Sequence, residues 1–297
     1  MAYGTPRSLD EVEEYYMDIR RGRRPTPELL EELKSRYMAI GGKTPLLEIT
    51  REQAKKLARA TGLKTYVGMK HWSPFIKETV AHMKADGCTR VTALVLAPHF
   101  SAMSTGGYMQ RFESAKTELG FEADVRFIER WGAHPIFITS IVERIKKALK
   151  RLKIHDLRKV MVVFSAHSLP EKIITAGDPY KDELLETSRL VVEQLNVPHW
   201  CFSFQSAGRT NDPWLGPSIG ESLKSIKASG FTKVLIVPIG FVTDNLEILY
   251  DLDIEAKLQA KELDLELHRI ETANATPRFI EALADVVSSS QITDPSL

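Results

Sequence analysis

The sequence of 297 residues has few cysteines, no excess of either charge and no long apolar run, and each shortage excludes a class of protein. Cys88 and Cys201 stand far apart, which excludes a disulfide framework, a CxxC zinc site and a cysteine-ligated iron–sulfur cluster. The 40 Lys and Arg residues nearly balance the 39 Asp and Glu residues, whereas a general nucleic-acid binder shows a basic excess. No apolar run approaches the ~18 residues of a membrane span, and the N-terminus does not look like a signal peptide. We therefore expect a soluble, cytoplasmic protein of one or two globular domains.

Several short motifs that identify common enzyme classes are also missing. The sequence contains no GxGxxG, which marks dinucleotide-binding folds, and no GxxxxGK[ST], the phosphate-binding loop of many NTPases. The GxSxG pattern of serine hydrolases occurs once, as GPSIG at 216–220, but it does not directly follow a predicted strand as a nucleophile elbow does, and neither cysteine has the context of a catalytic thiol. Dehydrogenase, P-loop NTPase and serine or cysteine hydrolase functions are therefore unsupported.

Short β-branched runs alternate with longer amphipathic stretches along the chain. The run Val160–Phe164 is continuously apolar, as expected of a strand that is buried on both faces of a parallel sheet. Strict alternation of strands and helices predicts an α/β protein of doubly wound architecture. The predicted strands are Thr65–Met69, Val91–Ala97, Asp124–Ile128, Val160–Ser165, Trp200–Phe204, Val234–Ile239 and Leu265–Ile270. The predicted helices are Leu9–Ile19, Pro27–Ile40, Pro74–Ala85, Pro135–Leu152, Tyr180–Leu195, Ile219–Ala228 and Leu246–Leu263.

Two parts of the chain have similar outlines. Met1–Pro6 and Phe164–Pro170 each combine a strand end, small polar residues and a proline. We interpret this as a tandem pair of similar α/β domains, although chance similarity between α/β units explains it equally well. The predicted division is an N-terminal domain over residues 1–155, a C-terminal domain over 156–274 and a helix over 275–297 that packs back on the first domain.

His167 is the first candidate for chemistry because it directly follows the most apolar predicted strand. Ligands of open α/β sheets bind beyond the carboxyl ends of the strands, so a histidine at this edge is well placed. Imidazole can accept a proton near neutral pH or ligate a metal such as Fe(II). A loop histidine that is hydrogen-bonded to backbone is the alternative.

Four carboxylates form a second candidate group on the helix that follows another apolar strand. They are spaced by 3, 4 and 4 residues, which places them on one face of an α-helix. A track of hard oxygen ligands attracts a divalent cation or conducts protons, and with His167 it supplies a histidine–glutamate pair. A solvated acidic face is the alternative. The four residues are Asp244, Glu247, Asp251 and Glu255.

A third group is basic, with four arginines in the five positions 20–24, followed by Arg36. Arginine binds carboxylates or phosphates in bidentate fashion, and a local cluster in a chain of net charge +1 suits a small anionic ligand. A solubilising turn explains the cluster equally well. Tyr3, Tyr37, Trp72, Tyr108 and Trp131 are aromatic residues that line a pocket or simply pack in the core.

Five motifs together resemble the ferrochelatase family, which inserts ferrous iron into porphyrins in haem biosynthesis. The resemblance covers nearly the whole chain, and five motifs in the right order are far more specific than one. They are MAYGTP at 1–6, FSAHSLP at 164–170, GDPY at 177–180, DPWLGP at 212–217 and FVTDNLEILYDLD at 241–253.

Within the family, MAYGTP and IRRGRRP (19–25) are most similar to the coproporphyrin III ferrochelatases. The resemblance implies two Rossmann-like domains with four-stranded parallel sheets, and iron insertion into a tetracarboxylate porphyrin. Iron is then a substrate, and no cofactor is permanently bound. We expect a monomer with no nucleic-acid partner. A protoporphyrin IX ferrochelatase, a cobalt or nickel chelatase, and a non-catalytic porphyrin or haem carrier are the alternatives.

The resemblance also implies roles for individual residues. His167 and Glu247 match the catalytic pair beside the iron, and Asp251 and Glu255 match further acidic positions that handle metal or protons. Tyr3 matches a tyrosine that can ligate product iron. The positions that match substrate contacts are Arg20, Arg36, Tyr37, Thr44, Tyr108 and Trp131.

Three departures from the family pattern are visible. Asn245 stands where many members have a histidine, and because an amide cannot titrate, only a hydrogen-bonding role remains there. Thr44 replaces the more usual serine. Relatives have several apolar residues before the MAYGTP segment, so we expect the first strand to be short in this chain.

Overall fold

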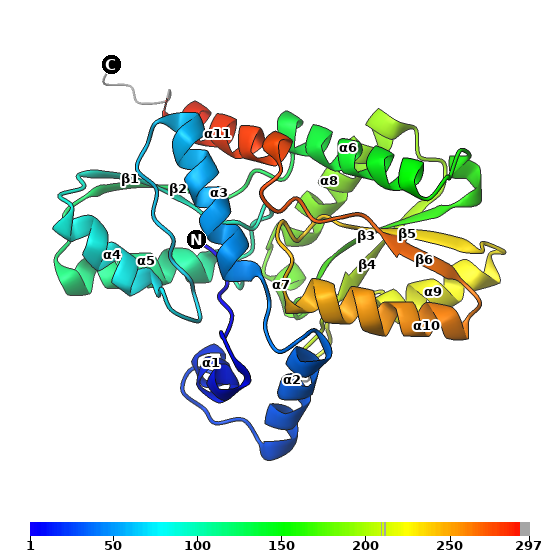
Figure 1. The fold of residues 1–297 in the computed structure, drawn as a ribbon, viewed down its shortest axis with the longest axis horizontal. Helices are drawn as coiled ribbons and strands as arrows, with labels where there is room; N and C mark the ends of the chain where they lie inside the picture. The colour runs from blue at the N-terminus through cyan, green and yellow to red at the C-terminus, as the bar shows by residue number, and fades with distance from the viewer. Residues whose placement is uncertain (209, 211, 292–297) are drawn as a thin grey trace.

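The computed structural model describes residues 1–208, 210 and 212–291, and it has an α/β architecture with parallel sheets between layers of helices (Figure 1). The strands are β1 (Arg90–Leu94), β2 (Asp124–Ile128), β3 (Met161–His167), β4 (Trp200–Gln205), β5 (Lys233–Pro238) and β6 (Glu266–Arg269). The longer helices are α1 (Val12–Ile19), α2 (Pro27–Ala39), α3 (Leu46–Thr61), α4 (Ile76–Ala85), α5 (Gly106–Leu119), α6 (Pro135–Arg151), α8 (Tyr180–Leu195), α9 (Ile219–Ala228) and α11 (Pro277–Gln291). The shorter helical segments are η1 (Leu9–Glu11), η2 (Leu157–Lys159), α7 (Lys172–Thr175), the π-helix η3 (Glu247–Ala256) and α10 (Lys257–Glu262).

The second half of the chain contains a four-stranded parallel sheet in the order β4-β3-β5-β6. β3 lies at its centre and is buried along most of its length, as its continuous apolar sequence predicts. α6 and α8 cover one face of this sheet, and α9 and α10 cover the other (Figure 1). The predicted parallel α/β architecture is therefore confirmed, and the four-strand prediction holds in this half.

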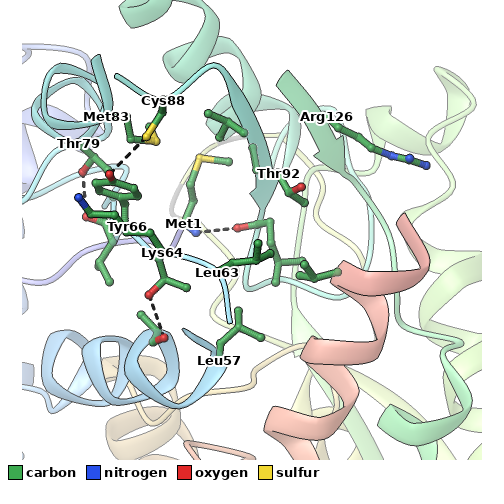
Figure 2. A pocket seen from close by; sticks show the side chains of 18 of the residues that line it. Met1, Leu57, Leu63, Lys64, Tyr66, Thr79, Met83, Cys88, Thr92 and Arg126 are labelled. Atoms are coloured by element: carbon green, nitrogen blue, oxygen red, sulfur yellow. Dashed lines mark hydrogen bonds between the residues drawn. The ribbon is translucent and has the colours of Figure 1, made fainter. Parts of the chain in front are cut away.

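The first half differs, because its described strands β1 and β2 form only a two-stranded parallel pair. The predicted strand Thr65–Met69 forms isolated parallel bridges at Met69, to Ala2 and to Phe75. Met1 and Ala2 lie between this segment and β1: the Met1 amino group donates to the carbonyl of Leu94, and the Ala2 N–H donates to the carbonyl of Gly68. Met1, this segment and β1 line a cavity of about 990 Å³ (Figure 2).

The helix predictions agree with the structure except at positions where the apolar pattern is broken. α3 was not predicted, and two of its four buried residues, Thr50 and Gln53, are polar. α5 was also missed because it begins with two glycines, Gly106 and Gly107, which are poor helix formers.

α11 packs against α3 and α6, and residues 292–297 of the predicted C-terminal helix lie outside the described part. The division into domains at residue 155 stays a prediction. In the part of the chain that the structure describes, no helix is both long enough and apolar enough to cross a membrane.

Candidate active site

His167 and Glu247 lie together at the carboxyl edge of the four-stranded sheet. His167 is the last residue of β3, and Glu247 begins the π-helix η3 after β5, the neighbour of β3. The imidazole Nδ1 is 3.1 Å from a carboxylate oxygen of Glu247, and both side chains are about one third exposed. The sequence prediction that these two residues form a pair at the sheet edge agrees with this geometry.

Backbone contacts fix the position of this pair. The Tyr180 hydroxyl donates to the carbonyl of His167 at 2.9 Å, and the Gln205 amide donates to the carbonyl of Glu247 at 3.2 Å. Gly240 allows the loop after β5 to pass close to β3, because a Cβ at this position would lie 2.6 Å from the Cβ of Ala166.

The charge of Glu247 makes His167 a stronger base. Burial alone would lower the pKa of His167, but the adjacent Glu247 carboxylate and the more distant Asp251 outweigh it and raise the pKa above its usual range. A histidine with a raised pKa holds a proton more firmly near neutral pH, which suits a group that must accept protons.

Three of the four predicted acids follow one another along the π-helix. Glu247 faces His167, Asp251 is buried behind it, and Glu255 lies at the exposed end. Asp244 lies apart from them, because its carboxylate accepts hydrogen bonds from Thr272 and Asn274. The π-helical hydrogen bonds, from residue i to i+5, were not predicted; such segments occur often at functional sites.

Asp251 is the buried centre of this track. Its carboxylate accepts a hydrogen bond from Ser206, and the Arg36 guanidinium lies 3.6 Å away. Burial, and then the charges of Glu247 and Glu255, raise the pKa of Asp251 to about 7 against the opposing effects of Ser206 and Arg36. Asp251 therefore exchanges protons near neutrality, as a relay from the His167 pair toward solvent requires.

The two predicted carboxylate-binding arginines are in different surroundings. Arg36 on α2 already faces Glu32, Asp251 and the ring of Tyr250. Arg20 ends α1 with its guanidinium over the ring of Tyr16, and its Nε is buried without a hydrogen-bond partner among the described residues. Arg20 thus has the unused donor that an incoming carboxylate needs.

Tyr37 and Thr44 belong to a buried hydroxyl network. Thr44 donates to the hydroxyl of Thr5 at 2.9 Å, and the Tyr37 hydroxyl lies 3.4 Å from the same atom. Burial raises the pKa of Tyr37 to about 12. The threonine in place of serine at position 44 keeps this hydrogen bond, and direct contact of either residue with a substrate stays a prediction.

Tyr3 is the most exposed of the predicted aromatic contacts, at 41% of its surface. Its ring lies 4.6 Å from the ring of His71, and the enclosure of its hydroxyl, followed by the charge of Glu247, raises its pKa. Tyr3 thus feels the charge of Glu247, and its predicted contact with iron or substrate stays a prediction.

Tyr108 and Trp131 lie in the core. Tyr108 is buried beneath the ammonium group of Lys70, 4.8 Å from its ring centre. Trp131 packs against Phe137 and Phe279, and its indole N–H donates to the carbonyl of Val95. The structure thus does not bring Trp131 together with the other candidates, and its role as a pocket wall stays a prediction.

A charged cluster that the sequence motifs do not indicate lies beside Tyr3. Asp18 lies 2.7 Å from His71 Nδ1 and 2.9 Å from the Arg111 guanidinium. Burial lowers the pKa of His71 to about 4 in spite of Asp18, so its ring is neutral at neutral pH. His71 closely follows the predicted strand Thr65–Met69, so the rule that selected His167 could have found it.

Asn245, the departure from the family pattern, has a structural role. Its side-chain carbonyl accepts a hydrogen bond from the backbone N–H of Ile248 at the start of the π-helix. Such a contact satisfies a donor that a helix start leaves open.

The arrangement offers few protein ligands to a metal. Within the described residues, no group of three or more His, Cys, Asp or Glu side chains is gathered for metal binding. A metal at His167 and Glu247 would therefore take its remaining ligands from other molecules, which suits a site that passes a metal on.

Comparison with solved structures defines the class of protein. The iron-bound chelatase SirB of Bacillus subtilis superposes with a TM-score of 0.59 at 12% identity, covering 83% of this chain and 92% of SirB. CbiX, described as the terminal enzyme of siroheme biosynthesis in denitrifying bacteria, gives a TM-score of 0.58 at 10% identity, covering 97% and 96% of the two chains. The fold is that of the chelatases.

Comparison of sequences gives the family. The family model described as Ferrochelatase matches residues 1–291. A ferrochelatase of Herpetosiphon aurantiacus is 44% identical over 97% of this chain and 96% of its own length. Coproporphyrin III ferrochelatases of a Geobacillus species and of Bacillus subtilis are 43% and 42% identical over 97% of this chain and 95% of their lengths. The chain belongs to the ferrochelatase family of metal chelatases.

Proposed function

We propose that this enzyme inserts Fe(II) into coproporphyrin III to give coproheme, in haem biosynthesis. The observation that carries the proposal is the His167–Glu247 pair, with 3.1 Å between imidazole and carboxylate at the sheet edge of a ferrochelatase. Support for coproporphyrin comes from the names of relatives at 41–43% identity.

The reaction needs a base, because two pyrrole protons leave the macrocycle as iron enters. His167 is the better acceptor, since Glu247 raises its pKa, and Glu247 is the hard oxygen donor beside it. Asp251, with a pKa of about 7, receives protons from the pair, and the exposed Glu255 passes them to solvent. In this proposal metal entry and proton exit use the same π-helix.

Substrate recognition in this proposal rests on guanidinium groups at the edge of α1 and α2. Coproporphyrin III carries four carboxylates, and charge-assisted hydrogen bonds to arginine are strong and directional. The unpartnered Nε of Arg20 is the first candidate, while Arg36 must exchange a contact with Asp251 for one with the substrate.

The test is anaerobic incubation with Fe(II) and either coproporphyrin III or protoporphyrin IX, followed by absorbance. We expect turnover with both porphyrins, but kcat/KM for protoporphyrin IX should be at least about tenfold lower than for coproporphyrin III. This ratio corresponds to ~1.4 kcal/mol of transition-state binding. Preference for protoporphyrin IX would contradict the substrate assignment. Stoichiometric binding without turnover would identify a carrier instead of an enzyme.

Four further points belong to the proposal: iron as substrate, the absence of an iron–sulfur cluster, the cytoplasmic location and the monomeric state. Iron is the substrate and no iron–sulfur cluster is bound, because Cys88 and Cys201, the chain's two cysteines, belong to different halves of the fold. The enzyme is a cytoplasmic monomer. Light scattering at micromolar concentration checks the last point, and a mass near 67 kDa, about twice the 33.5 kDa of one chain, would contradict it.

A further inference from the structure

Arg269 ends β6 at the same edge of the four-stranded sheet where His167 ends β3, and the proposed iron chemistry does not use it. Its side chain is 13% exposed, and its guanidinium group donates to both carboxylate oxygens of Asp253, from Nε at 2.9 Å and from Nη2 at 2.6 Å. Nη1 donates to the carbonyl of Ile270 at 3.1 Å. A bidentate pair of this kind fixes the orientation of its two side chains as well as their distance.

Asp253 belongs to the π-helix η3, so its pair with Arg269 ties that helix to the sheet. Asp253 follows Asp251 by only two residues, and side chains with this spacing do not share a helix face. Asp251 lies beside Ser206 and Arg36, whereas Asp253 contacts the last residue of β6. The helix is therefore attached to the sheet through a face that the acidic track does not use.

The same guanidinium group also reaches the chain just before the π-helix. Its Nη2 lies 3.6 Å from a carboxylate oxygen of Asp244, three residues before Glu247. The loop after β6 holds Asp244 as well, because Thr272 donates to one carboxylate oxygen at 2.8 Å and the Asn274 amide donates to the other at 2.9 Å. Arg269 and this loop thus hold the chain on both sides of Glu247.

A π-helix of ten residues needs contacts from outside to keep its hydrogen-bond pattern, because π-helical bonds occur mostly as single turns within α-helices. A change of these bonds from i+5 to i+4 would narrow each turn to the 3.6 residues of an α-helix and rotate the side chains about the axis. Glu247 and Asp251 could then not keep their present places, 3.1 Å from His167 and in the interior behind it. The contacts that fix the register also fix these two acids.

We propose that Arg269 is a positioning residue that sets the register of the π-helix, and through it the place of Glu247 beside His167 and of Asp251 behind them. The inference rests on the proposed function, since it concerns how the acids of that reaction are held. Arginine suits this task because its guanidinium group is always charged and presents a rigid fork of donors, whereas lysine offers a point charge on a flexible stem.

The first test is the kinetics of Arg269→Gln in the whole enzyme, which removes both the charge and the fork. We expect kcat with Fe(II) and coproporphyrin III to fall at least about tenfold, the usual effect of losing an outer partner of a metal-handling group, while KM for the porphyrin stays unchanged.

Lys257→Gln is the matched control, because Lys257 also lies next to Asp253, at 3.2 Å, but belongs to α10 and not to the sheet. This variant should keep the kcat of the unaltered enzyme. Equal kcat values for Arg269→Gln and Lys257→Gln, or a loss seen only in KM, would overturn the proposal.

Hydrogen exchange of backbone amides tests the positioning role without turnover, so it separates this inference from the proposed function. Amides of residues 247–256 should exchange at least about tenfold faster in Arg269→Gln than in the unaltered enzyme, while those of β3 keep their rate. Unchanged exchange in residues 247–256 would overturn the positioning role. Faster exchange in the variant, combined with an unaltered enzyme that does not turn over, would contradict only the proposed function.

Asp253→Asn breaks the same contact from the helix and keeps the proposal testable if Arg269→Gln does not fold. It should reproduce the loss of kcat at constant KM, and an unchanged kcat would overturn the proposal. The double variant should lose no more than Arg269→Gln alone, because the two changes remove one interaction. Additive losses would contradict the inference.

Discussion

At the scale of single residues, the site works by pairing each titratable group with a neighbour that changes its proton affinity. Glu247 raises the pKa of His167, and burial together with Glu247 raises that of Asp251 to about 7. His167 and Glu247 could be found from the sequence because each follows an apolar strand. The contact between Arg36 and Asp251 could not be found from the sequence, because 215 positions separate the two residues and many other arginines and acids could pair instead.

Replacement of His167 by alanine should remove the base without removing the porphyrin site. We expect a loss of turnover of at least about 100-fold, the usual contribution of a general base, with little change in porphyrin affinity. Steady-state rates and fluorescence titration of the porphyrin measure the two quantities. His155→Ala, at an exposed position between α6 and β3, is the control that should keep its turnover. Normal turnover of His167→Ala would contradict the assignment.

Arg20→Ala should weaken substrate binding. Loss of one charge-assisted contact is expected to raise KM for coproporphyrin III about tenfold while kcat changes little. Arg24→Ala is the matched control from the same turn, since the Arg24 side chain is 80% exposed and lies 3.8 Å from Glu13. Equal KM values for the two variants would contradict the prediction that Arg20 binds a carboxylate of the substrate.

Substitution of Trp131 distinguishes two roles for this residue, a wall of the substrate pocket or a part of the hydrophobic core. Its contacts with Phe137 and Phe279 predict that Trp131→Ala lowers the free energy of unfolding by about 3–5 kcal/mol. Trp131→Phe should lose less and leave KM unchanged. Urea denaturation measures the stability and steady-state kinetics measure KM for the porphyrin. A raised KM in a Trp131→Phe enzyme of unchanged stability would show that Trp131 contacts the substrate.

At the scale of elements, the sequence predicts the strands and helices whose apolar residues follow directly from their burial. β3 and β5 are continuous apolar runs between two helical layers, so their positions follow from composition alone. The π-helix η3 was predicted only as a helix, because the choice between bonds to i+4 and i+5 depends on contacts such as Gln205 with Glu247. The segment 65–69 failed as a strand because strands depend on partners that are distant in sequence.

The loop after β1 is joined to α8 by a buried contact that predicts a pH dependence of stability. His99 Nε2 lies 2.8 Å from the Thr187 hydroxyl, and burial lowers the pKa of His99 to about 3. The unfolded chain takes up a proton near pH 6.5 whereas the folded protein does not, so stability falls as pH falls below 6.5. From pH 6.5 to 5 the loss is about 2 kcal/mol.

Urea denaturation at stepped pH checks this expectation. His99→Gln should remove about 2 kcal/mol of the acid dependence, since glutamine does not titrate. Thr187→Val breaks the same hydrogen bond but retains the histidine, so its acid dependence should persist. An unchanged slope in His99→Gln would show that other groups cause the loss.

At the scale of the whole molecule, two sheets meet across a shared core. Trp131, Phe137 and Phe279 join α6 and α11 to the loop after β2, and the largest apolar cluster extends from them into β3. The alternation of strands and helices was enough to predict the α/β class and its parallel sheets. The resemblance led us to expect a short first strand, but the loss of the ladder along 65–69 was not visible from local patterns, because it depends on which segments become neighbours.

The contacts between the two halves are distributed unevenly, and this has a mechanical consequence. On one side, His99 and Thr187 are almost fully buried, and the N–H groups of Phe100 and Ala102 donate to carboxylates at the start of α8. On the other side, α2 meets the π-helix through Arg36 and Asp251, 3.6 Å apart. The dry contacts of His99 and Thr187 should therefore resist separation of the halves more strongly than the Arg36–Asp251 ion pair, whose arginine is partly open to solvent.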